Sequence, residues 1–412
     1  MVKSKWAGAV AQVRLEQEFF QQGAWKAYFY EDIRVIEDLW RNLQPANQQL
    51  LGFDFLKAVQ IFPPVGFNFY YVILEKDGQA VGLSYFQLMD LDLDRSVKTG
   101  TRPEHGLGKL RFDIMRYIRS FINVKLLVCG NFLTSGDQSY HFVDSKYREE
   151  GLKFLVDTSL ELLKLVSKQC KALKGVFFKD LPETNTAQVN LFSSEGFLTT
   201  HFQPRMLFEL NPAWTHFDDY LAAITSKYRV KAKKAMSKIE DFEIRSMNVD
   251  EIRTYNEEIN LYFDEIISNV SFNALSFPTG YFANLKEELG SKFECFGLFK
   301  EDSFMGFFSV IHGNEELEAH YIGMRNADNK RYKIYYNILL QLTKIGIDRG
   351  YKRINFSRTA MEIKSSIGAQ GETLNCYYKH PNKLLQFTSV QLYNLLKPDT
   401  VKWQARSPFK QK

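Results

Sequence analysis

Two short stretches of the chain, Lys76-Asp-Gly-Gln-Ala-Val-Gly82 and Lys300-Glu-Asp-Ser-Phe-Met-Gly306, share one pattern. Each is a polar turn that follows an aromatic or β-branched run, at residues 69–74 and 293–299, and a second apolar run starts after the glycine. Such runs on both sides of a polar turn predict a β-hairpin. The chain therefore contains an internal repeat, and this repeat decides how the fold is organised.

Each hairpin leads into the same downstream order of elements, which follows from apolar alternation in strands and helical apolar spacing in helices. The second copy predicts a strand at 315–324, a helix at 331–349, a strand at 353–357, a short helix at 360–368 and a final strand at 373–379. The first copy predicts a strand at 124–128, a helix at 150–168, a strand at 175–178, a helix at 187–194 and closing strands through residue 210. The fold class is therefore α/β, with strands and helices mixed in each half.

The two copies differ by one insertion and meet at one junction. An extra stretch at about 90–121 of the first copy has no counterpart in the second, and we interpret it as a lid or cover. Asn211-Pro212 favours a turn between the copies. Residues 217–239 then have the pattern of one basic amphipathic helix. We therefore predict a first domain at 1–210 and a second at 211–412.

The composition is that of a folded protein. The 412 residues are 45% hydrophobic, and a net charge of +5 is weak for this length, so any site for a polyanion must be local. No apolar stretch approaches the ~20 residues that span a bilayer, and residues 1–20 do not resemble a secretory signal. The four cysteines are Cys129, Cys170, Cys295 and Cys376. Their wide spacing predicts reduced thiols in a cytoplasmic protein.

Four segments carry a resemblance to a known family. They are Asp348-Arg-Gly-Tyr-Lys-Arg-Ile-Asn-Phe356, Ser357-Arg-Thr-Ala-Met-Glu-Ile-Lys-Ser-Ser-Ile-Gly-Ala369, Tyr377-Tyr-Lys-His380 and, in the first copy, Asn185-Thr-Ala-Gln-Val-Asn-Leu-Phe-Ser-Ser-Glu-Gly-Phe197. Together with the element order they resemble the GNAT acyltransferase fold twice over, in the tandem arrangement of the FemABX-like enzymes that form peptidoglycan bridges. The resemblance covers most of the chain. It implies two tandem GNAT-like domains, each a mixed, mostly antiparallel sheet flanked by helices.

The loop that binds the acyl donor is the part of the GNAT pattern that the sequence matches least. A GNAT site binds the pyrophosphate of a thioester donor on free amides at a helix N-terminus. Arg148-Glu-Glu-Gly151-Leu-Lys153 matches the usual loop only at Arg148 and Gly151, the candidate cofactor residues, and an ordinary helix start explains it equally well. The second copy has no glycine at residues 326–333. The resemblance leaves acyl-CoA or aminoacyl-tRNA as co-substrate, and no metal is expected.

Two candidate catalytic residues fall on the expected strand at 315–324. Acylation of an amine needs a base for the incoming amine and a donor for the oxyanion. Glu318 and His320 share one face of this strand because side chains alternate with a period of two. His320 is a candidate base with a pKa near neutrality, and Glu318 is a second candidate. The alternatives are a structural histidine and a solvent-facing carboxylate.

The remaining candidates follow in the second copy. Lys364 stands where Fem-type transferases carry a lysine that helps to stabilise the oxyanion, so the resemblance implies that role; a solvated surface lysine is the alternative. Arg358 and Thr359 begin the same short helix, where they could bind an anionic part of a substrate. Tyr377 and Tyr378 lie on adjacent faces of the final strand. One of these phenols, with Tyr377 preferred, is a candidate proton donor to the leaving group.

The strongest charge feature is a basic face on the expected helix at 217–239. Its residues are Lys227, Lys231, Lys234 and Lys238. This face could contact tRNA, a nucleotide-linked precursor or anionic lipid headgroups, and an ordinary exposed helix has the same pattern.

These observations predict an N-acyltransferase that transfers an acyl or aminoacyl group to an amine, with its cleft in the second copy. The resemblance places such an enzyme in cell-envelope precursor metabolism. The alternative is a non-catalytic binding module, in which the GNAT folds persist, the glycine loop has been lost and the basic face holds an anionic partner.

Overall fold

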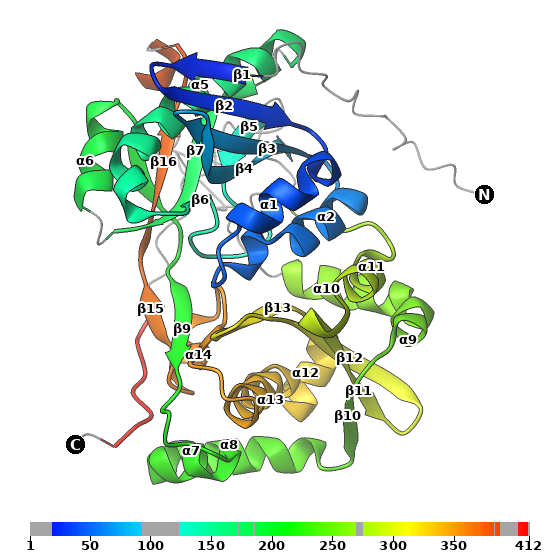
Figure 1. Cartoon of the computed structure of the whole chain (residues 1–412). Coiled ribbons are helices and arrows are strands. Elements are labelled where there is room, and N and C mark those ends of the chain that lie inside the picture. The colour runs from blue at the N-terminus through cyan, green and yellow to red at the C-terminus, as the bar shows by residue number, and fades with distance from the viewer. Residues whose placement is uncertain are drawn as a thin grey trace, which may run out of the picture.

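Two β-sheets organise the chain (Figure 1). The computed structural model describes residues 19–92, 123–170, 173–183, 186–268, 275–382, 384–387 and 403–410. The first sheet contains β1 (Phe19–Gln22), β2 (Trp25–Tyr30), β3 (Phe67–Lys76), β4 (Gln79–Asp92), β5 (Asn123–Cys129), β7 (Leu173–Pro182), β16 (Leu374–Lys379) and β8 (Leu198–His201) in that spatial order, with β6 (Tyr140–Phe142) beside β4. The second contains β10 (Phe242–Ser246), β11 (Phe293–Lys300), β12 (Ser303–His312), β13 (Glu316–Met324), β14 (Arg353–Asn355), β9 (Arg205–Glu209) and β15 (Gln370–Glu372).

Helices fill the space between the sheets and cover their outer faces. Between the sheets lie α1 (Glu37–Leu43), α2 (Phe53–Ile61), α9 (Val249–Thr254), α10 (Asn256–Ile267) and α11 (Tyr281–Leu289) (Figure 1). The outer face of the first sheet carries α5 (Arg148–Gln169) and α6 (Thr186–Ser194). The second sheet packs against α7 (Phe217–Ala223), α8 (Ser226–Met236) and α13 (Ile334–Asp348), with α12 (Asn326–Tyr332) and α14 (Met361–Ser365) nearby.

Three apolar cores result from this layering. The central core joins both halves of the chain, because Trp40 and Tyr71 from the first half belong to the same buried cluster as Phe282 and Phe307 from the second. The other two cores lie on the outer faces of the sheets. Burial of aromatic area on this scale supplies most of the driving force for folding, so the two sheets are joined by a shared core as well as by the chain.

The predicted repeat and fold class are confirmed. The two hairpins form as expected: β3 pairs with β4, β11 pairs with β12, and the first turn places Asp77 and Gly78 at positive φ. Each sheet has one parallel pair, β5 with β7 and β13 with β14, and the other strand pairs among the described residues are antiparallel. Each half is thus a mixed, mostly antiparallel sheet flanked by helices.

The two sheets exchange strands, which the sequence did not predict. β16 comes from the second half of the sequence but lies between β7 and β8 of the first sheet, and β9 lies between β14 and β15 of the second. The expectation that residues 373–379 close the second copy, and that closing strands of the first run to residue 210, is therefore wrong. Alternation identifies a strand but not its partner. The boundary near residue 211 remains a prediction.

The predicted basic helix at 217–239 is also wrong as a single helix. Helix α7 ends at Ala223 and α8 begins at Ser226, because Ile224 is extended and forms a bridge with Phe409. The Thr225 amide donates to the Pro408 carbonyl. The break comes from a contact with a distant segment, which local periodicity cannot detect. Most of the insertion expected at 90–121 lies outside the described residues, although β4 continues to Asp92.

Candidate functional site

The strands β13 and β14 separate close to their shared start. Their parallel pairing covers three positions, from Glu316 opposite Arg353 to Glu318 opposite Asn355, whereas β13 continues to Met324. On its other edge β13 contains a bulge, because two of its residues oppose one residue of β12. The two strands therefore separate beyond Glu318 and Asn355.

Glu318 is a buried carboxyl group at this point. Its Oε2 accepts a hydrogen bond of 2.8 Å from the Asn355 amide, and its Oε1 is buried without a hydrogen-bond partner. Burial raises the pKa of Glu318 well above its usual value and the nearby Glu316 adds to this rise, whereas Arg205 and the Asn355 hydrogen bond oppose it. The expected alternative of a solvent-facing carboxylate is excluded, since Glu318 is 1% exposed. A buried carboxyl with a free oxygen and a raised pKa is a candidate general base.

Lys364 lies nearby on α14 and is also buried. Its Nζ donates to the carbonyls of Phe356 at 2.6 Å and Arg358 at 2.5 Å. Burial lowers the pKa of Lys364 to about 7, and the negative charge of Glu318 opposes this shift. The carbonyls belong to a loop in which Ser357, Thr359 and Ala360 all have positive φ. Three such non-glycine residues in four positions are costly, and strain of this kind is typical of functional sites.

A buried ion cluster joins this loop to the first sheet. Asp180 on β7 contacts Lys179 Nζ and Arg358 Nη2 at 2.5 Å each, and it also accepts from the Gly136 amide at 3.0 Å. Burial opposes ionisation of Asp180, but the charges of Lys179 and Arg358 together hold its pKa below the usual value. Asp180 has a φ of 61°. Arg358 Nε and Nη1 are buried without partners, so the guanidinium keeps donors that an anionic group could use.

A loop of the first half closes the site from the other side. The Asn355 amide donates to the Ser135 carbonyl at 3.0 Å, and the Tyr321 hydroxyl donates to the Leu133 carbonyl at 2.5 Å. The Ser135 hydroxyl also contacts Ser357 Oγ at 3.2 Å. Glu318, Lys364 and Arg358 therefore lie where the two halves of the chain meet, and residues of both halves hold them in place.

The structure does not support a near-neutral base at His320. Burial alone lowers its pKa to about 3. Its Nδ1 lies 3.1 Å from Ser309 Oγ, and its ring contacts Tyr281, Phe282 and Phe293 in the central core. The expectation of a pKa near neutrality is therefore wrong, because the ring is enclosed by aromatic side chains instead of lining a wet cleft. His320 fits the alternative of a core histidine.

Tyr377 lies in a different part of the molecule from Lys364. As a residue of β16 it belongs to the first sheet, where its ring stacks on Phe192 with centroids 4.1 Å apart. The Asn375 amide donates to its hydroxyl at 3.2 Å, and burial raises its pKa. The strand exchange thus separates this phenol from the second sheet. Thr359 stays beside Arg358, half-buried at a φ of 65°.

Gly151 packs against aromatic rings on the first turn of α5. A Cβ at this position would lie 2.5 Å from Phe142 and 2.9 Å from Trp25, which is too close for any side chain. Its lack of a side chain thus lets α5 approach the sheet, a structural role that the sequence did not indicate. Arg148 is exposed at the helix start, beside Glu149 and Glu150, and two carboxylates there would repel a pyrophosphate.

We expect Gly151→Ala to lower the free energy of unfolding by about 1–3 kcal/mol, the usual cost of overpacking a core. Urea denaturation followed by circular dichroism would measure the change. Lys153→Ala, at an exposed position of the same helix, is the matched control and should shift stability by less than about 0.5 kcal/mol. Equal stability of Gly151→Ala and the native chain would contradict the packing role.

Two of the four lysines of the basic face, Lys231 and Lys238, contact other residues. Lys231 Nζ lies 4.6 Å from the centre of the Tyr336 ring, and Lys238 Nζ donates to the Arg331 carbonyl at 3.0 Å. Lys227 and Lys234 are exposed on α8.

Among the described residues there is no group of three or more His, Cys, Asp or Glu side chains placed to hold a metal ion. No helix in that same part of the chain has both the length and the apolar character to cross a bilayer.

Solved structures share this architecture. FemX superposes with a TM-score of 0.52 at 11% identity, over 90% of this chain and 100% of its own. The chain has a FemABX-like tandem GNAT fold. L-PGS from Bacillus licheniformis gives 0.49 at 14% identity, over 89% of this chain and 98% of its own, and a tandem GNAT protein from the clavulanic acid biosynthesis pathway gives 0.46 at 10%, over 86% and 99%. No protein-family model and no curated protein matches the sequence.

Sequence reasoning missed several residues of this tandem GNAT fold's junction: Lys179, Asp180, Asn355 and the loop at 130–139. One signal was available, because Lys179 and Asp180 interrupt the apolar strand β7 at positions where a buried strand rarely carries charge. The partners of these charges come from the other half of the chain, and no local pattern names them.

Proposed function

We propose that this protein transfers an acyl group from an activated ester or thioester to an amine, at the junction where β13 and β14 separate. The observation that carries the proposal is the free, buried Oε1 of Glu318, because a raised pKa makes the ionised form of this carboxyl group a stronger base than an exposed glutamate. The FemABX-like tandem GNAT fold agrees with acyl transfer, but at 11% identity FemX supports the fold alone.

The proposed reaction starts from the ionised form of Glu318: the amine nitrogen attacks the acyl carbonyl carbon, and Glu318 Oε1 accepts the proton that the amine loses. Lys364 donates a hydrogen bond to the oxyanion of the tetrahedral intermediate, since its two bonds to backbone carbonyls leave one ammonium N–H. The intermediate then expels the thiolate or alkoxide of the donor. The protonated Glu318 returns the proton to that leaving group, which restores the starting carboxylate.

The donor in this proposal is a carrier with phosphate groups, either acyl-CoA or aminoacyl-tRNA. Neither helix start offers an open glycine loop: Gly151 is packed against Phe142, and α13 follows Lys333 at a φ of 58°. The partnerless donors of Arg358 and the exposed Lys227 and Lys234 are the groups that we propose for the anionic carrier. The amine acceptor is not assigned.

The test is turnover of each donor with a mixture of small amines. Release of free thiol from acetyl-CoA, and loss of radiolabel from charged tRNA, would be followed for the native protein and for Lys364→Ala. We expect one donor to be consumed, and Lys364→Ala to lower its rate by about 10²–10³-fold, as for loss of an oxyanion donor.

Circular dichroism and thermal unfolding of Lys364→Ala separate a chemical effect from loss of fold. Lys364→Arg, which keeps a charge at this position, serves as the conservative variant. Full activity of folded Lys364→Ala would remove this residue from the mechanism. If neither donor is consumed and tRNA binding is lost when Lys231, Lys233 and Lys234 are neutralised, the non-catalytic binding module is correct.

A further inference from the structure

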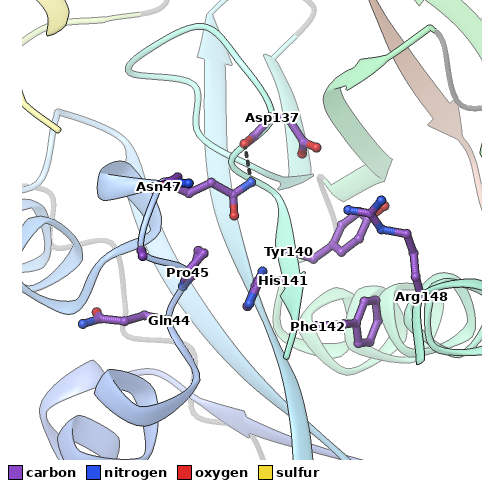
Figure 2. Close-up of a pocket in the computed structure, with 10 residues that line it drawn as sticks. Gln44, Pro45, Asn47, Asp137, Tyr140, His141, Phe142 and Arg148 are labelled. Atoms are coloured by element: carbon purple, nitrogen blue, oxygen red, sulfur yellow. Dashed lines mark hydrogen bonds between the residues drawn. The ribbon is translucent and has the colours of Figure 1, made fainter. Parts of the chain in front are cut away.

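A second polar site lies in the first half, at the start of α5. A pocket of about 360 Å³ opens between residues 44–48, which follow α1, and residues 137–148, which lead into α5. Figure 2 shows Asp137, Tyr140 and Arg148 along one side of this pocket, with His141 between Tyr140 and Pro45. Its lining is mainly polar, which suits a small charged ligand.

Two residues that line this pocket each carry a hydrogen-bond acceptor without a partner. Asp137 Oδ1 and Gln48 Oε1 are both buried and accept no hydrogen bond. The orientation of the Gln48 amide is fixed, because its Nε2 donates to the Asp137 carbonyl at 2.9 Å, the bond drawn as a dashed line at Asp137 in Figure 2. Buried acceptors are normally satisfied, and each one left open is costly. The pair therefore calls for a ligand that donates hydrogen bonds.

The charges around the pocket also favour a donor ligand. Asp137 and Arg148 both line the pocket but form no ion pair with each other in the described part of the chain. The first turn of α5 carries Glu149 and Glu150, so their carboxylates already compensate the positive end of the helix dipole. The site that the sequence predicted for a pyrophosphate thus offers hydrogen-bond acceptors inside and one guanidinium at its rim. A phosphate-binding site offers hydrogen-bond donors instead.

We propose that this pocket binds an amino-acid-like ligand, with its primary ammonium group donating to Asp137 and Gln48 and its anionic group held by Arg148. Two of the three ammonium N–H groups can donate to the two open acceptors, and the exposed Arg148 guanidinium can bind a carboxylate through paired hydrogen bonds. The site is separate from the junction at Glu318, and the proposal does not depend on the acyl transfer described above.

Binding should strengthen as the pH rises. Burial raises the pKa of Asp137 to about 6; the nearby Ser139 amide and the charges of Arg148 and Arg205 oppose this rise, and Asp180 adds to it. His141 also faces the pocket, but burial and Arg148 lower its pKa, so it stays neutral at pH 7. Below about pH 6 the ligand must therefore displace a proton from Asp137, and affinity should fall between pH 7.5 and pH 5.

The experiment is a ligand-observed NMR titration with three probes: L-alanine, which carries both charges, L-alaninamide, which carries only the ammonium group, and N-acetyl-L-alanine, which carries only the carboxylate. We expect the first two to bind and the third not to bind. Asp137→Asn should weaken binding of both ligands about tenfold or more, the effect of losing a charge-assisted hydrogen bond. Arg148→Gln should weaken L-alanine only.

Asp38→Asn removes the same charge from an exposed position on α1 and is the matched control. Arg148 is also exposed, so Arg148→Gln keeps the test valid even if Asp137→Asn does not fold. Binding of N-acetyl-L-alanine in preference to L-alaninamide would overturn the proposal, as would ammonium binding that Asp137→Asn leaves unchanged or the absence of binding by all three probes.

Discussion

Glu318→Gln is expected to lower the rate of acyl transfer by about 10²–10⁴-fold, the usual contribution of a general base, while the folded protein becomes more stable at pH 8. The amide keeps the shape of the side chain and can still accept from Asn355, but it cannot take a proton from an amine. Rates measured per mole of folded protein, with whichever donor the native protein consumes, would give the loss.

The stability effect has a definite sign. Because the folded state raises the pKa of Glu318, it holds this proton more tightly than the unfolded chain does. The stability of the native protein therefore falls as the pH rises above about 4.3, the pKa of a glutamate in the unfolded chain. The Glu318→Gln protein has no carboxyl group at this position, so it does not lose stability in this way. Denaturation at pH 5 and pH 8 measures it. Glu315→Gln, in an exposed pair with Lys352, is the control. An active, equally stable Glu318→Gln protein would remove Glu318 from the proposed mechanism.

Asp180→Asn is expected to lower the free energy of unfolding by about 3–5 kcal/mol, the usual cost of removing one partner from a buried ion pair. It would leave Lys179 and Arg358 as buried cations without their counter-charge, since Asp180 is fully buried and bonded to both. Chemical denaturation at pH 7 measures the loss. Asp241→Asn, which breaks a surface pair with Lys300, should cost less than about 1 kcal/mol.

Two further measurements define this cluster. The folded state lowers the pKa of Asp180, so its contribution to stability is present above about pH 4 and is lost as the pH falls through the lower folded value. The double variant Lys179→Met with Asp180→Asn should lose less stability than the sum of the single variants, because fewer buried charges remain unpaired. Additive losses would show that Lys179 and Asp180 do not act as a pair.

Local patterns predicted the elements of this fold well. The polar turns at Asp77 and Glu301 marked both hairpins, and the helical spacing of apolar residues marked α5 and α13. Local patterns failed where a distant segment decides the outcome. The sequence of β16 predicts a strand but does not name its neighbours, which are β7 and β8, and Tyr377 of this strand stacks on Phe192. The break at Ile224 depends in the same way on Phe409.

The sequence predicted some residues of the candidate site but not their environment. Glu318 and Lys364 were named, one from its place on a strand and the other from the family resemblance, and the structure brings both to the junction. The sequence could not show that they are buried, and burial raises the pKa of Glu318 and lowers the pKa of Lys364. His320 shows the opposite outcome, because the same kind of burial places its pKa too low for a base.

The exchanged strands constrain how the chain is made. During synthesis, β7 and β8 leave the ribosome long before β16, which must lie between them, since Pro182 pairs with Leu374. Until then the nascent first sheet has an open gap with unpaired amides and carbonyls on both sides, a surface prone to wrong pairing. Cotranslational folding of the first half alone is therefore incomplete. We expect the two halves to reach their native state in one concerted, late event.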